Sequence, residues 1–284
     1  MPSLKELFPQ FNKRTLIMGV VNATPDSFSD GGLFFDKERA VRHAYELVRD
    51  GADMIDIGGE STRPGAEPVT LEEEIRRTVP VISEISKHIG VPVSIDACKA
   101  ETARQALEAG ASMINDISGL RFDPGMACIA ARYGSPVIIM HIKGRPGDMQ
   151  KSPVYEALIP EIMDYLREGV RIAVQAGISD DRILIDPGIG FGKTFDHNLF
   201  ILKHLAEFAG LGKPIVVGVS RKAFIGKVLG DLPASERLEG TLAAVTAAVL
   251  NGADIVRVHD VKETVRAVKV ADAIKRGCME KTST

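Results

Sequence analysis

The fold is indicated by residues 54–63, which read Met54-Ile55-Asp56-Ile57-Gly58-Gly59-Glu60-Ser61-Thr62-Arg63. A short apolar run here leads into polar residues with chemically useful side chains. Seven further apolar runs lead to polar residues in the same way: Leu16–Val21 before Asn22, Pro92–Ile95 before Asp96, Met113–Ile114 before Asn115-Asp116, Pro136–Met140 before His141, Ile183–Ile185 before Asp186, Pro214–Val219 before Ser220-Arg221-Lys222, and Asp254–Val256 before Arg257 and His259. Parallel strands that are covered on both faces read as such runs.

Helical-looking stretches separate almost every neighbouring pair of these runs, as the crossovers between parallel strands require. Eight such units in 284 residues match the usual size of a (β/α)8 TIM barrel, about 250 residues. In that α/β fold the loops after the strands form the catalytic face. We therefore predict a single barrel with one active site at its strand ends. The alternative is an open doubly wound sheet, whose ligands also bind beyond the carboxyl ends of the strands.

Helix boundaries follow from caps and glycines. Asp36 precedes a predicted helix at Lys37–Arg49, and Thr70 with Glu73 forms a capping-box pattern. Further helical stretches are expected at Ala100–Ala109, Pro153–Ala176, Pro233–Leu250 and Val261–Arg276. The connections Ala23–Phe35 and Ser61–Val69, after the first and second strands, are long and polar. They are typical of lids over an active site.

Composition indicates a soluble enzyme with one domain. We predict an N-terminal extension at 1–14, a barrel at 15–277 and a C-terminal tail at 278–284. The net charge of −3 lacks the basic excess of nucleic-acid-binding proteins. No apolar stretch approaches the roughly 20 residues that span a membrane, and the N-terminus lacks a signal-peptide core. Three cysteines without disulfide or zinc spacing fit the cytoplasm.

Two groups of strand-end residues indicate chemistry. Arg63, Arg257, His259 and Lys222 suggest a site for an anionic group, because the arginine fork matches phosphate oxygens. The alternative is structural pairing of these residues with neighbouring carboxylates.

Asp96, Asn115 and Asp186 could form hydrogen bonds with a flat heterocycle that carries several N–H groups. Alternatively, they close the barrel end through hydrogen bonds to the backbone. Asn22 opens a run rich in oxygen ligands that suits Mg²⁺ or, equally, an Asx turn.

The glycine-rich stretch Pro187–Thr194 resembles a nucleotide-binding loop but fails both nucleotide motifs. Pro187 occupies the leading glycine position of a phosphate-binding loop, and Lys193 replaces the last glycine of a dinucleotide fingerprint. We expect these glycines to let the backbone approach a ligand, with Phe191 as an exposed ring that packs on it.

Five separated motifs between about Thr15 and Gly277 resemble the dihydropteroate synthase family: Asn22–Gly32, Asp56–Gly65, Asp186–Lys193, Ser220–Lys222 and Arg257–Val261. The resemblance implies a barrel enzyme, a transferase of folate biosynthesis. Such an enzyme joins 4-aminobenzoate to 6-hydroxymethyl-7,8-dihydropterin diphosphate, giving 7,8-dihydropteroate and diphosphate. It also implies a homodimer formed through helices away from the catalytic face, and inhibition by sulfonamides.

The resemblance assigns roles by matching position. The pterin would be held by Asp96, Asn115, Asp186 and Lys222, with Met140 against its ring. Mg²⁺ would be bound by Asn22, and the diphosphate by Arg63, Arg257 and His259. The aminobenzoate would be lined by Thr62, Pro64, Phe191 and Ser220, and the substrate site would also include Asp56 and Gly218. The catalytic group would comprise Arg63, Lys222, Arg257 and His259.

These roles suggest a mechanism in which Mg²⁺ and the Arg/His group stabilise the departing diphosphate. The pterin methylene then becomes cationic, and the two long loops close to exclude water. Ala97, Cys98 and Arg145 depart from the family pattern and bear on affinity and drug sensitivity. Cys98 otherwise reads as a small buried filler.

Two rival functions are a pterin-binding methyltransferase that serves a corrinoid protein and a non-catalytic pterin-binding homologue. The first would need no diphosphate group, and the complete set of site residues argues against the second.

Overall fold

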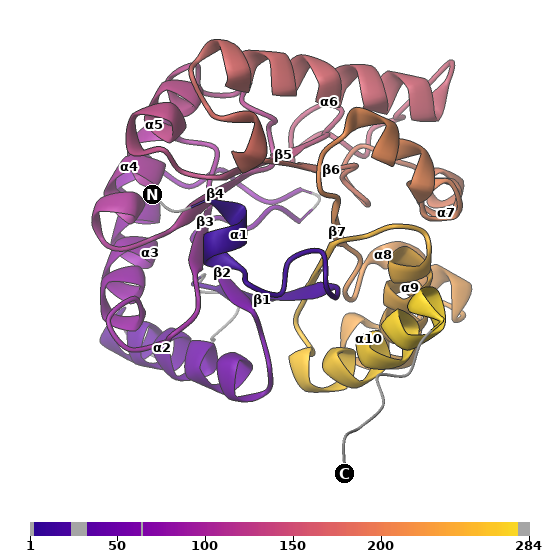
Figure 1. The fold of residues 1–284 in the computed structure, drawn as a ribbon, viewed down its shortest axis with the longest axis horizontal. Coiled ribbons are helices and arrows are strands. Elements are labelled where there is room, and N and C mark those ends of the chain that lie inside the picture. The colour runs from indigo at the N-terminus through magenta and orange to yellow at the C-terminus, as the bar shows by residue number, and fades with distance from the viewer. Residues whose placement is uncertain (1–2, 24–32, 64, 278–284) are drawn as a thin grey trace.

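The computed structural model describes residues 3–23, 33–63 and 65–277 (Figure 1). Its sheet has eight parallel strands: β1 (Leu16–Asn22), β2 (Met54–Gly58), β3 (Val93–Asp96), β4 (Met113–Asp116), β5 (Val137–Met140), β6 (Ile183–Asp186), β7 (Val216–Gly218) and β8 (Ile255–Val258). They pair in the order β6-β5-β4-β3-β2-β1-β8-β7. A parallel bridge between Ile185 and Ile215 then brings β6 to the segment that enters β7. The predicted barrel is confirmed, and the open sheet is excluded.

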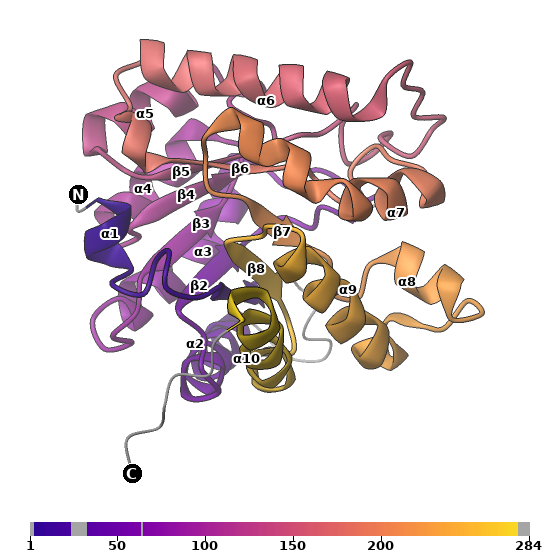
Figure 2. The same ribbon diagram turned by 45° about the vertical axis from the view of Figure 1, so that its right-hand side comes forward.

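Helices surround the strands (Figures 1 and 2). The α-helices are α1 (Leu4–Leu7), α2 (Leu33–Arg49), α3 (Leu71–Ile85), α4 (Ala100–Glu108), α5 (Gly125–Tyr133), α6 (Leu158–Gln175), α7 (Phe195–Lys203), α8 (Ala223–Val228), α9 (Leu238–Leu250) and α10 (Val261–Arg276). Short 3-10 helices lie at η2 (Asp180–Arg182), η3 (Leu205–Leu211) and η4 (Ala234–Glu236). Within the described ranges, no helix combines the length and apolar character needed to cross a membrane.

Three predicted helix starts are wrong. Helix α2 begins at Leu33, so Asp36 lies inside the helix and does not cap it. Helix α6 begins at Leu158, because the Glu161 carboxylate accepts hydrogen bonds from the backbone N–H groups just before the helix, at 2.6 and 2.9 Å. The stretch after Pro233 first forms η4, and α9 starts only at Leu238.

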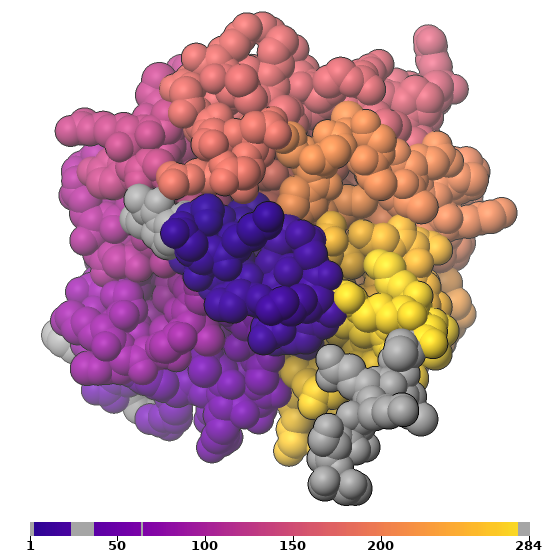
Figure 3. All heavy atoms as spheres, in the orientation of Figure 1, coloured from indigo at the N-terminus to yellow at the C-terminus, as the bar shows by residue number. Residues whose placement is uncertain are grey.

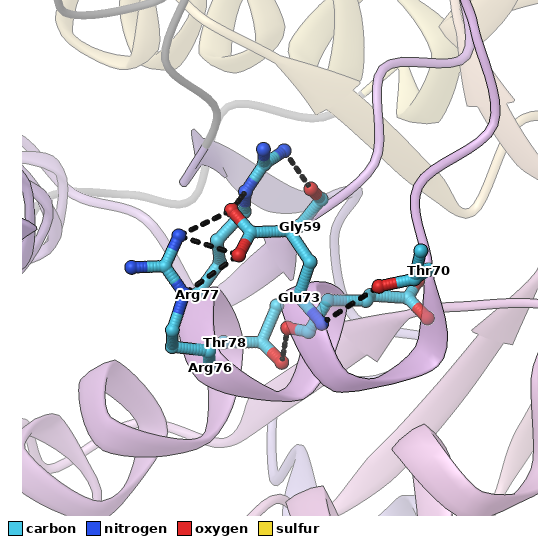
Figure 4. Close-up of polar contacts among 7 residues, drawn as sticks. Gly59, Thr70, Glu73, Arg76, Arg77 and Thr78 are labelled. Atoms are coloured by element: carbon cyan, nitrogen blue, oxygen red, sulfur yellow. Dashed lines mark hydrogen bonds and ion pairs between the residues drawn. The ribbon is translucent and has the colours of Figure 1, made fainter.

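The start of α3 is tied to the loop after β2. Thr70 Oγ1 accepts the Glu73 backbone N–H at 3.3 Å, which is half of the predicted capping box. The Glu73 carboxylate instead binds Arg76 and Arg77, and Arg77 Nη1 donates to the Gly59 carbonyl at 3.0 Å (Figure 4). These contacts fix the first residue of the loop that carries Thr62 and Arg63.

The barrel interior has two layers. The floor is a buried apolar cluster of Leu16, Met18, Met54, Met113, Ile138, Leu184, Val216 and Ile255. Leu4 of α1 and the neighbouring Phe8 pack into it, and the N-terminal segment occupies the centre of that face (Figure 3). Side chains alternate along a strand, so the residues two positions beyond the floor also point inward. This upper layer includes Asp56, Asn115, Met140, Asp186, Gly218 and Arg257.

Candidate active site

Arg257 lies at the centre of an ion-pair network that crosses the upper layer. Its Nε donates to Asp56 Oδ2 at 2.6 Å, and its Nη2 donates to Asp96 Oδ2 at 2.7 Å. Asn115 Nδ2 donates to the same Asp56 oxygen at 3.0 Å. These side chains come from β8, β2, β3 and β4, so the network joins strands across the barrel. The structural pairing considered from the sequence is therefore present for Arg257.

Asp186, at the end of β6, is held in a similar way. Its Oδ1 accepts the Gly188 backbone N–H at 2.7 Å. Asp96, Asn115 and Asp186 thus each use one polar atom within the protein. Each also keeps one oxygen without a hydrogen bond from any other described residue. Three free acceptors suit a planar ring that carries several N–H donors.

Burial sets the ionisation of these groups. It raises the pKa of Asp96 to about 7, although Arg257 opposes the rise, and the pKa of Asp186 to about 6. Burial also lowers the pKa of Lys222 to about 8, reinforced by the charge of Arg257. Near neutral pH, Asp96, Asp186 and Lys222 are therefore each within about one unit of their own pKa.

Phe191 packs beneath this site rather than into solvent. It is 8% exposed and belongs to a buried cluster with Ile117 and Met140. The Lys222 Nζ lies 4.2 Å from the centre of its ring, a cation–π distance. The prediction of an exposed ring is wrong, because the loop folds back onto β5.

The glycines of this loop approach the protein's own backbone. Gly188 has φ +70°, and a Cβ there would lie 1.9 Å from the His141 carbonyl oxygen. Gly192 has φ +63°, and its Cβ would lie 2.3 Å from the Lys143 carbonyl oxygen. Residues with a side chain would be both strained and blocked at these positions. At these two glycines the backbone therefore lies close to the segment that leaves β5.

Lys193 is buried and makes a contact that the sequence does not indicate. Its Nζ lies 2.8 Å from His141 Nδ1 and donates to the Phe191 carbonyl at 2.9 Å. Burial lowers the pKa of both Lys193 and His141 well below their usual values. The pair ties the Phe191 backbone to the end of β5. The two residues are 52 positions apart, so no local sequence pattern predicts the contact.

His259 and Ser220 meet beside Arg257. Ser220 Oγ accepts the His259 backbone N–H at 3.2 Å and lies 3.0 Å from His259 Nδ1. The hydroxyl proton is then free to point at Nδ1, which places the imidazole proton on Nε2. Burial, reinforced by Arg257, lowers the pKa of His259 to about 3. At neutral pH His259 is therefore a neutral N–H donor.

Between Ser220 and Lys222, Arg221 has the left-handed φ of +58°. Its guanidinium turns outward to Asp260, with the Nε–Oδ2 distance at 3.0 Å, and its backbone N–H is bound by Thr241 Oγ1 at 3.0 Å. Because of this turn, the Arg221 side chain binds Asp260 and does not join Ser220 and Lys222 in the site.

A cavity of about 490 Å³ opens beside Asp96 on the catalytic face. Its lining includes Thr62, Cys98, Phe122 and Arg145, whose guanidinium lies 4.2 Å from the Phe122 ring centre. The loop after β2 reaches this region, because the Gly65 N–H donates to the Pro146 carbonyl at 3.2 Å.

The remaining predicted residues lie at the rim or outside the description. Arg63 is exposed, Gly218 is half-buried in register with Arg257, and Pro64 lies outside the described residues. Most of Ala23–Phe35 also lies outside them.

Asn22 offers an oxygen suited to a hard cation. It ends β1 in register with Gly58. A Cβ on Gly58 would lie 3.9 Å from Asn22 Oδ1 and 3.7 Å from Asp96 Oδ2, so the glycine leaves space between two oxygens. Mg²⁺ commonly takes one or two protein ligands and completes its shell with phosphate and water. In the described part of the chain, no three His, Cys, Asp or Glu residues could hold a metal together.

The barrel and its strand-end site define an enzyme of the (β/α)8 class that binds a small polar heterocycle. Residues 18–259 match the family described as pterin binding enzyme. The chain belongs to this family.

Its relatives narrow the class. The chain is 50% identical over 264 residues to a dihydropteroate synthase of Bacillus subtilis, covering 93% of this chain and 90% of the relative. A Clostridium difficile dihydropteroate synthase, solved in the presence of pteroic acid, has a TM-score of 0.89 at 44% identity, with 94% and 98% coverage. A Xanthomonas albilineans dihydropteroate synthase with 4-aminobenzoic acid has a TM-score of 0.87 at 45% identity, with 92% and 93% coverage.

Proposed function

We propose that this protein is a dihydropteroate synthase that condenses 6-hydroxymethyl-7,8-dihydropterin diphosphate with 4-aminobenzoate, releasing diphosphate. The observation that carries the proposal is the set of free acceptor oxygens on Asp96, Asn115 and Asp186 beside the basic groups of Lys222 and Arg257. The amino-pyrimidine edge of a pterin supplies N–H donors to these three acceptor oxygens. The negative charge of a diphosphate is matched by the basic groups of Lys222 and Arg257.

The ring would lie over the Met140–Phe191 cluster, and Lys222 would hold it from the side. Thr62, Pro64, Phe191 and Ser220 would line the aminobenzoate. Sulfonamides would compete for that position, and a Yersinia pestis dihydropteroate synthase at 42% identity was solved with a sulfonamide drug complex.

Arg63, Arg257 and His259 would hold the diphosphate, the last through its Nε2–H. Binding a leaving group more tightly as its charge grows accelerates bond cleavage. Asn22 would hold Mg²⁺, which supplies positive charge to phosphate oxygens when bound. The carboxylates of Asp96 and Asp186 would stabilise the positive charge that develops on the pterin and its methylene. The arylamine nitrogen then forms the new C–N bond and loses a proton.

The test mixes the protein with Mg²⁺, 4-aminobenzoate and the dihydropterin diphosphate, and measures released diphosphate together with dihydropteroate. We expect equimolar amounts, with release dependent on 4-aminobenzoate. Binding of the pterin without either product would instead favour the methyltransferase or the non-catalytic reading. Omission of Mg²⁺ is expected to slow release, and an unchanged rate would remove the metal from the proposal.

We further propose that the protein is a homodimer. Helices α7, α8 and α9 pack against one another on one side of the barrel (Figure 2). They expose a group of large apolar side chains: Leu199, Phe200, Val228, Leu229 and Leu250. Apolar groups of this kind often mark interfaces.

Light scattering after gel filtration tests the dimer. Wild type is expected at twice the chain mass and Phe200→Asp at the chain mass, while Val270→Asp on α10, also at an exposed apolar position, remains a dimer. A monomeric wild type would overturn this proposal.

We also place the enzyme in the cytoplasm. Cys98 and Cys128 carry free thiols, which suit a reducing compartment. Recovery of activity in the soluble cytosolic fraction checks this.

A further inference from the structure

Asp56 is the most enclosed member of the upper layer. Its side chain is 0% exposed. A single oxygen, Oδ2, accepts from both Asn115 Nδ2 at 3.0 Å and Arg257 Nε at 2.6 Å. The other oxygen, Oδ1, has no hydrogen-bond partner among the described residues, and neither does the hydroxyl of Ser94, the register neighbour on β3.

This enclosure decides which way the Asn115 amide points. A carboxylate paired with a guanidinium only accepts hydrogen bonds, so the amide must turn its NH₂ group toward Asp56. The opposite orientation would set the amide oxygen against a carboxylate oxygen at hydrogen-bonding distance. That arrangement loses the hydrogen bond and places two electron-rich oxygens in contact. Asn115 Oδ1 therefore faces away from Asp56.

We infer that Asp56 is a positioning residue that makes the site selective for a ring carrying an amino group rather than an oxo group at the recognised edge. The inference rests on the proposed function and deepens it. With Asn115 fixed, Asp96, Asn115 and Asp186 all present oxygens. An amino-pyrimidine offers N–H groups to them, whereas a 2-oxo ring places a carbonyl where one of those donors is required.

Asp56 acts through its neighbours and does not touch the ring. Its Oδ2 is already bound to Asn115 and Arg257, and its Oδ1 is buried without a partner among the described residues. In this proposal Asp56 orients Asn115, whereas the family resemblance implied a direct place for it in the substrate site.

Two substitutions separate the acceptor from the charge. Asp56→Asn removes the charge but keeps one oxygen that can accept from Asn115 and Arg257. Asp56→Leu removes both the charge and the acceptor and keeps the branching at Cγ, with a larger side chain. The probes are 6-hydroxymethylpterin and its 2-oxo counterpart, 6-hydroxymethyllumazine, and calorimetry gives a Kd for each.

Wild type and Asp56→Asn are expected to prefer the 2-amino ring at least tenfold. In Asp56→Leu this ratio is expected to fall at least fivefold, because the amide can then present either end. Part of the preference remains, since Asp96 and Asp186 still accept. The ratio of two Kd values is a suitable readout because general loosening of the site weakens both probes.

The double variant Asp56→Leu/Asn115→Asp provides a charge-matched rescue. A carboxylate at position 115 presents an oxygen whichever way it turns, so the preference should return to within about threefold of wild type. Asp56→Thr, whose hydroxyl can donate to a turned Asn115 carbonyl, replaces Asp56→Leu if the latter does not fold.

A full wild-type ratio in Asp56→Leu or Asp56→Thr would overturn the inference, as would a wild type that binds both rings equally. Equal losses in Asp56→Asn and Asp56→Leu would assign the effect to charge and also overturn it. Failure of wild type to bind the pterin at all would instead reject the proposed function.

Discussion

The floor and the upper layer of the barrel interior stand on the same strands, two residues apart, and have opposite chemistry. Met113 belongs to the sealed apolar floor, while Asn115, the next inward residue of β4, carries a hydrogen bond to Asp56. The contrast shows how one alternating strand separates stability from chemistry. Changes in the floor should affect folding, and changes above it should affect turnover.

The largest expected effect comes from Arg257→Ala. Two buried carboxylates would lose their shared cation, and the diphosphate would lose a donor. We expect kcat/KM to fall roughly 1,000-fold or more, in line with the loss of a key charged donor. Arg167→Ala, at an exposed arginine on α6, is the control. Steady-state kinetics that match wild type would remove Arg257 from the reaction.

The floor is tested by Met113→Ala. Met113 is 0% exposed, so the change leaves a cavity and should lower the free energy of unfolding by about 3 kcal/mol. Urea titration measures this loss. Turnover at a temperature where the variant stays folded should remain within about twofold of wild type. A large fall in kcat there would show that the two layers are not independent.

The upper layer should also respond to pH. Ionised carboxylates accept hydrogen bonds from the pterin, so kcat/KM should rise as pH increases through the pKa values of Asp186, about 6, and Asp96, about 7. It should fall above about 8, where Lys222 loses its proton. In a profile of kcat/KM we expect a change of about tenfold per pH unit between the two carboxyl pKa values and on the alkaline side, and a steeper fall below the pKa of Asp186. Lys222→Met should lose the alkaline limb, and its persistence would assign that limb elsewhere.

The smallest effect is expected at the start of α3. Thr70→Ala removes the hydroxyl that accepts the Glu73 N–H and should cost about 1 kcal/mol of unfolding free energy. Because α3 holds Gly59 through Arg77, we also expect a modest rise in KM for 4-aminobenzoate. Thr70→Ser keeps the cap and is the control. If Thr70→Ser loses as much unfolding free energy as Thr70→Ala, the effect does not come from the hydroxyl.

Sequence reasoning reached the barrel because short apolar runs with polar ends are a local pattern. It also placed Asp96, Asn115 and Asp186 at one end of the barrel, since parallel strands share a direction. The hydrogen bonds from Asn115 and Arg257 to Asp56 could not be predicted, because the two donors lie 59 and 201 positions from Asp56 in the sequence. Pairing across a closed barrel depends on register and closure, which no short segment contains.

The incorrect predictions have local causes. The glycines around Phe191 suggest an exposed ring, but they let the loop fold against the segment that leaves β5, and the ring is buried. Asp36 has the chemistry of a cap, yet α2 has already begun at Leu33. The residue types were read correctly in both cases, and the position of the neighbouring backbone decided the outcome.

The placement of α1 has a consequence for the order of folding. Leu4 and Phe8 precede every strand in the chain, but the cluster that receives them includes residues of β1 and of β8. Their binding surface is complete only after Ile255 has joined the sheet. During synthesis these two apolar side chains therefore emerge before their binding surface exists, and this segment should be among the last parts of the barrel to dock.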